Sequence, residues 1–151
     1  MAIRMRTRSW PLALATSMAA MMALASSSLP AQEPSRSVRD GVYTEAQAHR
    51  GAEAFAQYCA SCHGVSLGGT GEAPSLVGGQ FISEFDGLTV ADLFDRIRKT
   101  MPLNDPGGLR RAQYADILAF VLKSNGFPTG QNQLDYRSEY LSDIRFQAPN
   151  P

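Results

Sequence analysis

The feature that most constrains this chain of 151 residues is a short stretch with two cysteines and a histidine, Cys59-Ala60-Ser61-Cys62-His63. On a helical turn, residues three and four apart lie on the same side, so we expect both sulfur atoms and the imidazole to face one way. The sequence contains two cysteines in all, so neither has another cysteine to pair with. A group bound here must therefore accept two sulfurs and one nitrogen from a single turn.

This C-x-x-C-H spacing is typical of the covalent attachment of a c-type haem. Cys59 and Cys62 would form thioethers with the two vinyl groups of one porphyrin, and His63 would be the proximal ligand of the iron. The alternatives are a thioredoxin-like dithiol, half of a zinc site, and chance. A redox dithiol is expected in a βαβ pattern, which is not present, and a zinc site needs further ligands, for which the sequence offers only His49. We expect His49 to be a surface or packing residue.

Residues 1–31 have the composition of a signal peptide. Three arginines lie within the first eight residues, and a mostly apolar run follows over residues 10–24. This run is shorter than the ~20 residues that a membrane-spanning helix needs. We therefore expect cleavage after Ala25 or after Ala31, with an uncleaved anchor as the alternative. Export suits haem attachment, which takes place outside the bacterial cytoplasm, and predicts a soluble periplasmic protein with no membrane span after cleavage.

Removal of this segment changes the charge and the methionine content of the chain. The formal charge moves from zero, with 14 basic and 14 acidic residues, to −3, because three arginines leave and every acidic residue lies beyond residue 31. This balance argues against a nucleic-acid-binding protein, which would carry a basic face. Five of the six methionines also leave, so Met101 is the only one that remains.

The rest of the chain is long enough for one small domain with tails. Residues 32–42 are polar and predict a flexible leader before a domain over residues 43–126. Residues 64–80 contain six glycines and predict a loop that is wrapped around another group of the protein or a bound molecule. An all-α core of about 80 residues without disulfides is only marginally stable. A haem would supply the missing apolar body, so we expect no compact fold without it.

The hydrophobic pattern predicts three main helices. The first begins at Thr44, which forms a capping-box pattern with Gln47, and continues up to the Cys59 motif. The others run from Thr89 to about Thr100 and from about Leu109 to Ser124. No stretch alternates with period two for long enough to predict a strand. The predicted fold class is all-α.

A C-terminal tail over residues 127–151 is unusually rich in large apolar residues for a polar extension. Six of them fall within thirteen positions: Leu134, Tyr136, Tyr140, Leu141, Ile144 and Phe146. This is too many for a solvated, disordered segment. We expect the tail to dock on the domain, with docking on a partner as the alternative.

Taken together, residues 43–126 resemble the class I c-type cytochromes with one haem. Beyond the attachment motif, the similarity lies in Ala73-Pro74-Ser75-Leu76, in Thr100-Met101-Pro102 and in the terminal helix from Tyr114 to Leu122. The resemblance implies the class I cytochrome c fold, with three helices and a glycine-rich loop around one covalent haem c. It also implies that the first and last helices cross at Gly51, with Phe55 meeting Ile117 and Phe120.

The same resemblance implies roles for individual residues. Met101 would be the distal iron ligand, although a core methionine is the alternative. The backbone carbonyl of Pro74 would accept a hydrogen bond from His63, unless this proline only shapes the loop. Arg98 and Lys99 would pair with a haem propionate or lie solvated. The residues expected to line the haem pocket are Leu67, Leu76, Leu93, Phe94 and Ile97.

A narrower similarity concerns the partner. The stretches Asp105-Pro106-Gly107 and Ser124-Asn125-Gly126-Phe127-Pro128 resemble monohaem cytochromes that serve quinone-cofactor (pyrroloquinoline quinone) dehydrogenases. This implies a one-electron Fe(III)/Fe(II) carrier rather than an enzyme, placed between such a dehydrogenase and an acceptor such as a terminal oxidase. Two alternatives remain open. One is a haem-bearing subunit of a fixed dehydrogenase or oxidase complex, and the other is a ligand-binding or peroxidatic haem protein.

Overall fold

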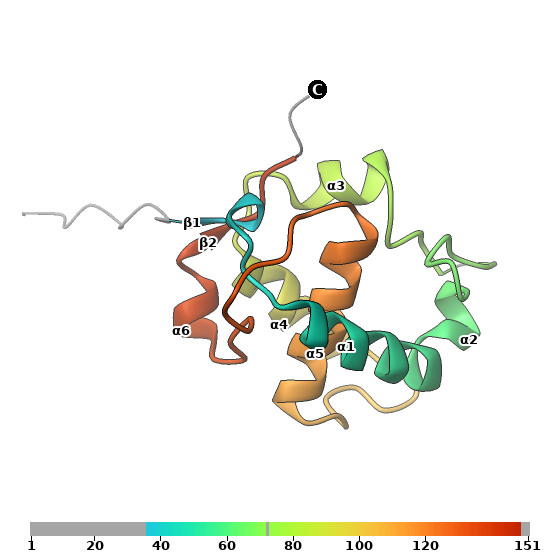
Figure 1. Cartoon of the computed structure of the whole chain (residues 1–151). Coiled ribbons are helices and arrows are strands. Elements are labelled where there is room, and N and C mark those ends of the chain that lie inside the picture. Colours follow the sequence, from blue (N-terminus) through green and yellow to red (C-terminus); the bar gives the residue numbers. More distant parts are fainter. Residues whose placement is uncertain (1–35, 72, 149–151) are drawn as a thin grey trace, which may run out of the picture. The chain divides into compact units, whose positions relative to one another are not determined.

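The computed structural model describes residues 36–71 and 73–148 (Figure 1). The predicted signal peptide, with its cleavage sites after Ala25 or Ala31, lies outside the described residues. The elements follow in the order β1 (Arg36–Ser37), the 3-10 helix η1 (Val38–Asp40), α1 (Glu45–Tyr58), α2 (Ala60–His63), α3 (Gly79–Phe85), α4 (Val90–Thr100), α5 (Arg111–Ser124), α6 (Ser138–Leu141) and β2 (Ile144–Arg145). Helices dominate, so the all-α prediction is confirmed. Over the described ranges, no helix has both the length and the apolar character that crossing a membrane requires.

Helices α1 and α5 cross at a glycine. A Cβ added to Gly51 of α1 would lie only 1.8 Å from the backbone carbonyl oxygen of Asp116 in α5. One turn along, the rings of Phe55 and Phe120 lie 5.4 Å apart. Arg50 spans the same crossing and donates to both carboxylate oxygens of Asp116, at 3.0 and 2.9 Å. The close helix crossing implied by the cytochrome resemblance is therefore confirmed.

The start of α1 differs in one respect from the prediction. The Thr44 hydroxyl caps the helix by accepting a hydrogen bond from the Gln47 N–H at 3.2 Å. The returning half of the capping box is wrong, because the Gln47 side chain is buried and bonds elsewhere. Its amide donates to the Leu134 carbonyl at 2.9 Å and accepts from the Leu134 N–H at 2.7 Å. A buried amide needs partners for both of its ends, and the tail backbone provides them.

Helix α4 has well-defined ends. The Thr89 hydroxyl accepts from the Asp92 N–H at 3.2 Å, and the Asp92 carboxylate accepts from the Thr89 N–H at 2.8 Å, which completes a capping box. The helix ends at Thr100, and the next residue, Met101, is extended (φ −126°, ψ 153°), since a residue before proline avoids helical geometry. Helix α5 begins at Arg111, slightly later than predicted, and ends before Gly126.

The predicted loop over residues 64–80 leads into a helix that was not predicted. Helix α3 begins with Gly79, and glycine is a poor helix former, so the local signal is weak. Packing compensates for this. Phe81 and Phe85 are buried, and both rings contact Phe146 of the tail, at 6.1 and 6.0 Å between ring centroids.

The flexible leader predicted over residues 32–42 is wrong for residues 36–42. Strand β1 pairs in parallel with β2 of the tail, with Arg36 opposite Ile144. Val38 and Val42 are buried in the core. The segment is ordered because these two valines gain a hydrophobic environment. The mostly polar composition of residues 32–42 gave no sign of this burial.

The tail lies on the rest of the protein, as expected. Four of its six large apolar side chains are buried, namely Leu134, Leu141, Ile144 and Phe146. Tyr136 and Tyr140 are about half exposed. Arg111 of α5 donates to the Tyr136 carbonyl at 3.0 and 2.7 Å, which fixes the middle of the tail. The folded unit therefore extends on both sides of the predicted 43–126 domain.

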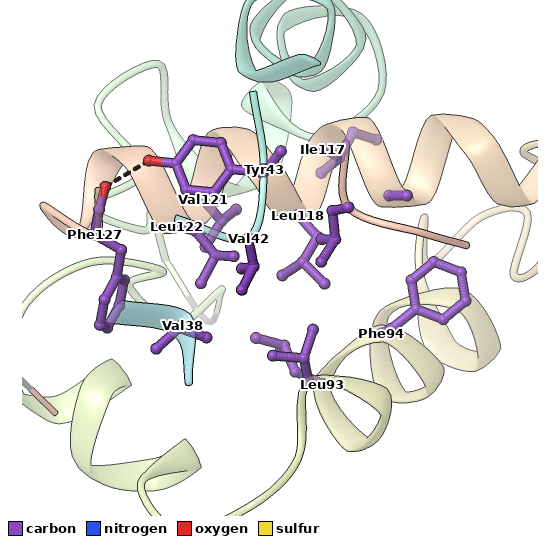
Figure 2. Close-up of a cluster of buried hydrophobic side chains, with 14 of the residues drawn as sticks. Val38, Val42, Tyr43, Leu93, Phe94, Ile117, Leu118, Val121, Leu122 and Phe127 are labelled. Carbon is purple, nitrogen blue, oxygen red and sulfur yellow. Dashed lines mark hydrogen bonds between the residues drawn. The ribbon is translucent and has the colours of Figure 1, made fainter. Parts of the chain in front are cut away.

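The hydrophobic core lies between α4, α5 and the leader (Figure 2). In this view, Val38 and Val42 of the leader point toward Leu93 of α4 and Leu118 of α5. At its edge the buried hydroxyl of Tyr43 donates to the Phe127 carbonyl at 2.5 Å. Burial, with a smaller effect of Glu45, raises the pKa of Tyr43 to about 12. This core is larger than the sequence suggested, because both predicted tails contribute to it.

Candidate functional site

The two cysteines and the histidine form a helical turn of their own. Helix α1 ends at Tyr58, and Cys59 has non-helical dihedral angles (φ −125°, ψ −33°) before α2 begins. The N–H groups of Cys62 and His63 both donate to the Cys59 carbonyl, at 3.1 and 3.0 Å. The three residues therefore belong to one tight turn, as the spacing predicted. Cys59 is partly buried, Cys62 is exposed, and both carry free thiols.

The environment of Cys59 does not suit a redox dithiol. Reactive thiol pairs depend on a lowered thiol pKa, so that the thiolate is available at neutral pH. Here burial, with a smaller contribution from Cys62, raises the pKa of Cys59 to about 11. The thiol is therefore protonated near neutral pH and is held beside apolar surface.

The imidazole of His63 is held in one orientation. The side chain is buried, and its Nδ1 lies 3.0 Å from the carbonyl oxygen of Pro74. Because a carbonyl oxygen can only accept, Nδ1 must carry the proton in this contact. The lone pair of Nε2 is then available to a metal, and the hydrogen bond makes that nitrogen a better donor. The contact that the resemblance implied for Pro74 is present.

The glycine-rich loop between His63 and Pro74 is tightly folded. Gly69 donates from its N–H to the His63 carbonyl at 2.8 Å, and its φ of +78° is a conformation that favours glycine. Leu67 is buried, and its carbonyl accepts from the Leu76 N–H at 2.8 Å. The loop thus brings Pro74 back to the histidine.

Asn125, at the end of α5, fixes the far end of this loop. Its amide donates to the Leu76 carbonyl at 2.9 Å, and its side-chain oxygen accepts from the Gly78 N–H at 3.0 Å. The sequence suggested only a helix stop at this position. No sequence pattern signals such a contact, because Asn125 and Leu76 lie far apart in the chain.

Met101 lies at the junction of α4 and the loop that precedes α5. Its N–H donates to the Ile97 carbonyl at 2.8 Å, and its carbonyl accepts from the Tyr114 hydroxyl at 2.7 Å. Met101 is partly buried. The residue is therefore held by two helices, through its backbone. Its role as an iron ligand stays a prediction.

The residues predicted to line a haem pocket differ in their surroundings. Leu93 and Phe94 are buried in the core, where the Phe94 ring lies 6.5 Å from the Tyr114 ring. Ile97 and Leu76 are partly buried at the edge of the core. Their role toward a cofactor stays a prediction.

The basic end of α4 contains an unusual guanidinium. Among the described residues, the Nε of Arg98 is buried without a hydrogen-bond partner, although it lies 3.6 Å from the Asp95 carboxylate. Lys99 bonds to the same carboxylate at 2.8 Å. This hydrogen bond, with the charge of Arg98, keeps the pKa of Asp95 below its usual value. A buried N–H that lacks an acceptor costs free energy. A haem propionate that accepted this hydrogen bond would remove that cost.

These residues fit a haem by their chemistry. The turn provides two thiols and an imidazole whose Nε2 is available, and Met101 adds a soft thioether of the kind that ligates haem iron in cytochromes c. The other histidine, His49, is exposed and pairs with Glu53 at 3.4 Å, as expected for a surface residue.

The helical fold and its Cys-Cys-His turn define a c-type cytochrome domain with one attachment motif, a class whose members transfer electrons through haem. Residues 46–121 match the model of the family described as cytochrome C oxidase, cbb3-type, subunit III. The chain belongs to this family.

Comparison with solved structures gives a match to the sulfane dehydrogenase SoxCD from Paracoccus pantotrophus, at 24% sequence identity and a TM-score of 0.48. The match covers 66% of this chain and 52% of that chain, so this protein spans about half the length of the matched chain. No curated protein matches the chain.

Proposed function

We propose that this protein is a periplasmic one-electron carrier with a single haem c, attached through Cys59 and Cys62 and ligated by His63 and Met101. The observation that supports it best is the contact between His63 and Pro74. A carbonyl 3.0 Å from Nδ1 fixes the tautomer in which Nε2 can bind iron. The haem, when bound, supplies the one-electron Fe(III)/Fe(II) couple.

The residues of the chain hold both proposed ligands of this couple in place. His63 is restrained by the loop, and Met101 by the ends of two helices, so neither ligand needs to move when the charge changes. A neutral thioether and burial both favour the less charged ferrous state. The reduction potential should therefore be higher than that of a haem with two histidine ligands.

The exposed surface near the ligands suits exchange with a redox partner. Val65 and Leu103, each two residues after a proposed ligand, are 86% and 80% exposed. We propose a dehydrogenase with a quinone cofactor as the donor and a terminal oxidase as the acceptor, on the resemblance of the segments around Asp105 and Asn125. The second candidate is a haem-bearing subunit of a fixed complex, because the family description names an oxidase subunit.

Export and covalent attachment can be tested together. The full chain, expressed in a bacterium that matures c-type cytochromes, should give a periplasmic band that keeps haem staining after denaturing electrophoresis. Cys59→Ala should greatly reduce this staining, while Ser61→Ala, which preserves the spacing of the motif, should not. Haem that is extracted by acidic acetone would contradict covalent attachment. On gel filtration of the periplasmic fraction, a carrier elutes as a single chain and a complex subunit elutes with its partners.

A further inference from the structure

The backbone of Met101 is fixed from two sides. Its N–H bonds within α4, to the Ile97 carbonyl, and its carbonyl accepts from the Tyr114 hydroxyl of α5 at 2.7 Å. With both polar groups engaged, only the side-chain torsions of Met101 remain free. Methionine loses considerable rotamer entropy when it is ordered, so a fixed backbone lowers the cost of holding its sulfur in one place.

Tyr114 also holds the other end of the Met101 loop. Its hydroxyl oxygen lies 3.5 Å from the N–H of Leu109, which donates to it. The hydroxyl therefore donates to the first residue of the segment 101–109 and accepts from the last. One buried oxygen closes the loop between α4 and α5.

The ring that carries this hydroxyl cannot easily move. Tyr114 is 1% exposed, and its ring packs edge-on against Phe94 of α4, at 84° between the ring planes. The guanidinium of Arg111 lies 5.1 Å from the centroid of the same Phe94 ring. The hydroxyl of Tyr114 is thus positioned by the packing of its ring against α4.

We propose that Tyr114 is a positioning residue for the iron ligand: its hydroxyl holds the Met101 backbone so that the thioether stays on the iron in the ferric state. This inference rests on the proposed function, in which Met101 ligates the iron. Ferric iron binds a neutral thioether less favourably than ferrous iron does, so the ferric protein is the state in which loss of this restraint has an effect.

The test is a titration of the ferric, haem-loaded protein with imidazole, followed by absorbance. Imidazole must displace the Met101 sulfur to reach the iron, so its apparent affinity reports how firmly the sulfur is held. Tyr114→Phe removes only the hydroxyl. Loss of one hydrogen bond should raise the apparent imidazole affinity about 2- to 10-fold.

Tyr43→Phe is the matched control. It also removes a buried tyrosine hydroxyl that donates to a backbone carbonyl, that of Phe127 at 2.5 Å. Both variants should lower the melting temperature, but Tyr43→Phe should leave the imidazole affinity unchanged. An unchanged affinity in Tyr114→Phe, or an equal rise in both variants, overturns the inference.

Met101→Ala separates this inference from the proposed function. If Met101 ligates the iron, Met101→Ala binds imidazole far more tightly than the wild type, and adding Tyr114→Phe to it changes nothing further. An effect of Tyr114→Phe that persists without Met101 overturns the positioning role alone. If Met101→Ala binds imidazole as the wild type does, Met101 is not the ligand, and the inference is overturned with the proposed ligation.

Discussion

The two residues proposed to bind the iron are each fixed by a hydrogen bond to a backbone carbonyl. His63 donates to the carbonyl of another residue, whereas Met101 supplies the carbonyl itself. The imidazole of His63 donates to the carbonyl of Pro74, so the orientation of the ring depends on where the loop places that oxygen. Met101 instead offers its own carbonyl to Tyr114. In both cases the ligand atom remains available, because the contact uses a different group of the residue.

Replacement of Met101 by alanine should lower the reduction potential. The neutral thioether is a ligand that raises the potential of a haem, and its loss exposes the iron to water. We expect a fall of more than about 59 mV, which for a one-electron couple corresponds to about 1.4 kcal/mol. Potentiometric titration measures this fall in potential. If Met101 ligates the iron through sulfur, the ferric wild type also has a weak absorption near the red edge of its spectrum, which should disappear in Met101→Ala. Leu103→Ala, at a side chain that is 80% exposed, is the control, and an unchanged Met101→Ala spectrum would show that another group occupies the distal position.

Gly51→Ala should destabilise the protein strongly. The added methyl would meet the Asp116 carbonyl at 1.8 Å, and helix backbone cannot yield as a flexible side chain does. We expect a loss of about 3 kcal/mol or more in the free energy of unfolding, measured with guanidinium chloride. Gly79→Ala is the matched control, because a Cβ there meets nothing within 4 Å. Equal stability of the two variants would disprove the close crossing of α1 and α5.

Among the elements, the C-terminal tail depends most on contacts distant in sequence. Leu134 pairs with Gln47 of α1, and Phe146 lies among Phe81, Phe85 and Phe127, the last at 5.3 Å between ring centroids. These contacts cover α1 and α3 from outside. The tail is therefore part of the folded unit.

Phe146→Ala should show this directly. Its ring is fully buried, so its removal should cost about 3–5 kcal/mol of stability, the range for large buried aromatic residues. Tyr136→Ala, at a ring that is 47% exposed, should cost less than about 1 kcal/mol. Thermal unfolding compares the two variants. If Phe146→Ala is as stable as Tyr136→Ala, the tail does not contribute to the core in solution.

The sequence predicted the elements whose signals are local. Helices α1, α4 and α5 have caps and apolar spacing, and the crossing at Gly51 followed from a family resemblance. Helix α3 was not predicted, because its first residue, Gly79, disfavours a helix and the distant Phe146 packs on it. The order of residues 36–42 was missed for a similar reason, since Val38 and Val42 are buried by residues distant in sequence, among them Leu93 and Leu118.

In the candidate site, too, the local features could be predicted from the sequence and the long-range contacts could not. The Cys59–His63 turn and the contact of His63 with Pro74 could be expected from the motif and its family. The hydrogen bond from Tyr114 to Met101 could not, because the tyrosine reads as one more apolar residue on a helix face. The unpartnered nitrogen of Arg98 likewise becomes visible only when the burial of the side chain is known.

At the scale of the whole molecule, most buried core residues lie outside the Cys-Cys-His turn, of which Cys59 and Ala60 pack against the core. The core joins α4, α5, the leader and the tail, and its side chains contact one another directly (Figure 2). That the chain has no compact fold without haem stays a prediction. If any part keeps its structure without the cofactor, we expect it to be the buried part around α5, because the described residues of 60–71 and 73–78 are mostly exposed or half-buried.

The Cys59→Ala/Cys62→Ala double variant, produced without haem, tests this division. Backbone amides of α5 should be protected from hydrogen exchange, because they lie in the core. Amides of residues 60–71 should exchange rapidly, since the turn has lost the group around which it folds. Uniformly rapid exchange would show that the cofactor is required for the whole fold, and uniform protection would show that it is required for none of it.

The parallel pairing of β1 with β2 has a practical consequence for work on electrodes. It places residue 36, the first described residue, next to residue 144 near the C-terminal end of the folded unit. In Figure 1 these strands lie on the opposite side of the molecule from α2, which carries His63. A surface linker attached at the exposed side chain of Arg36 would therefore hold the protein with its Cys-Cys-His turn facing the solution, where a freely diffusing redox partner can reach it.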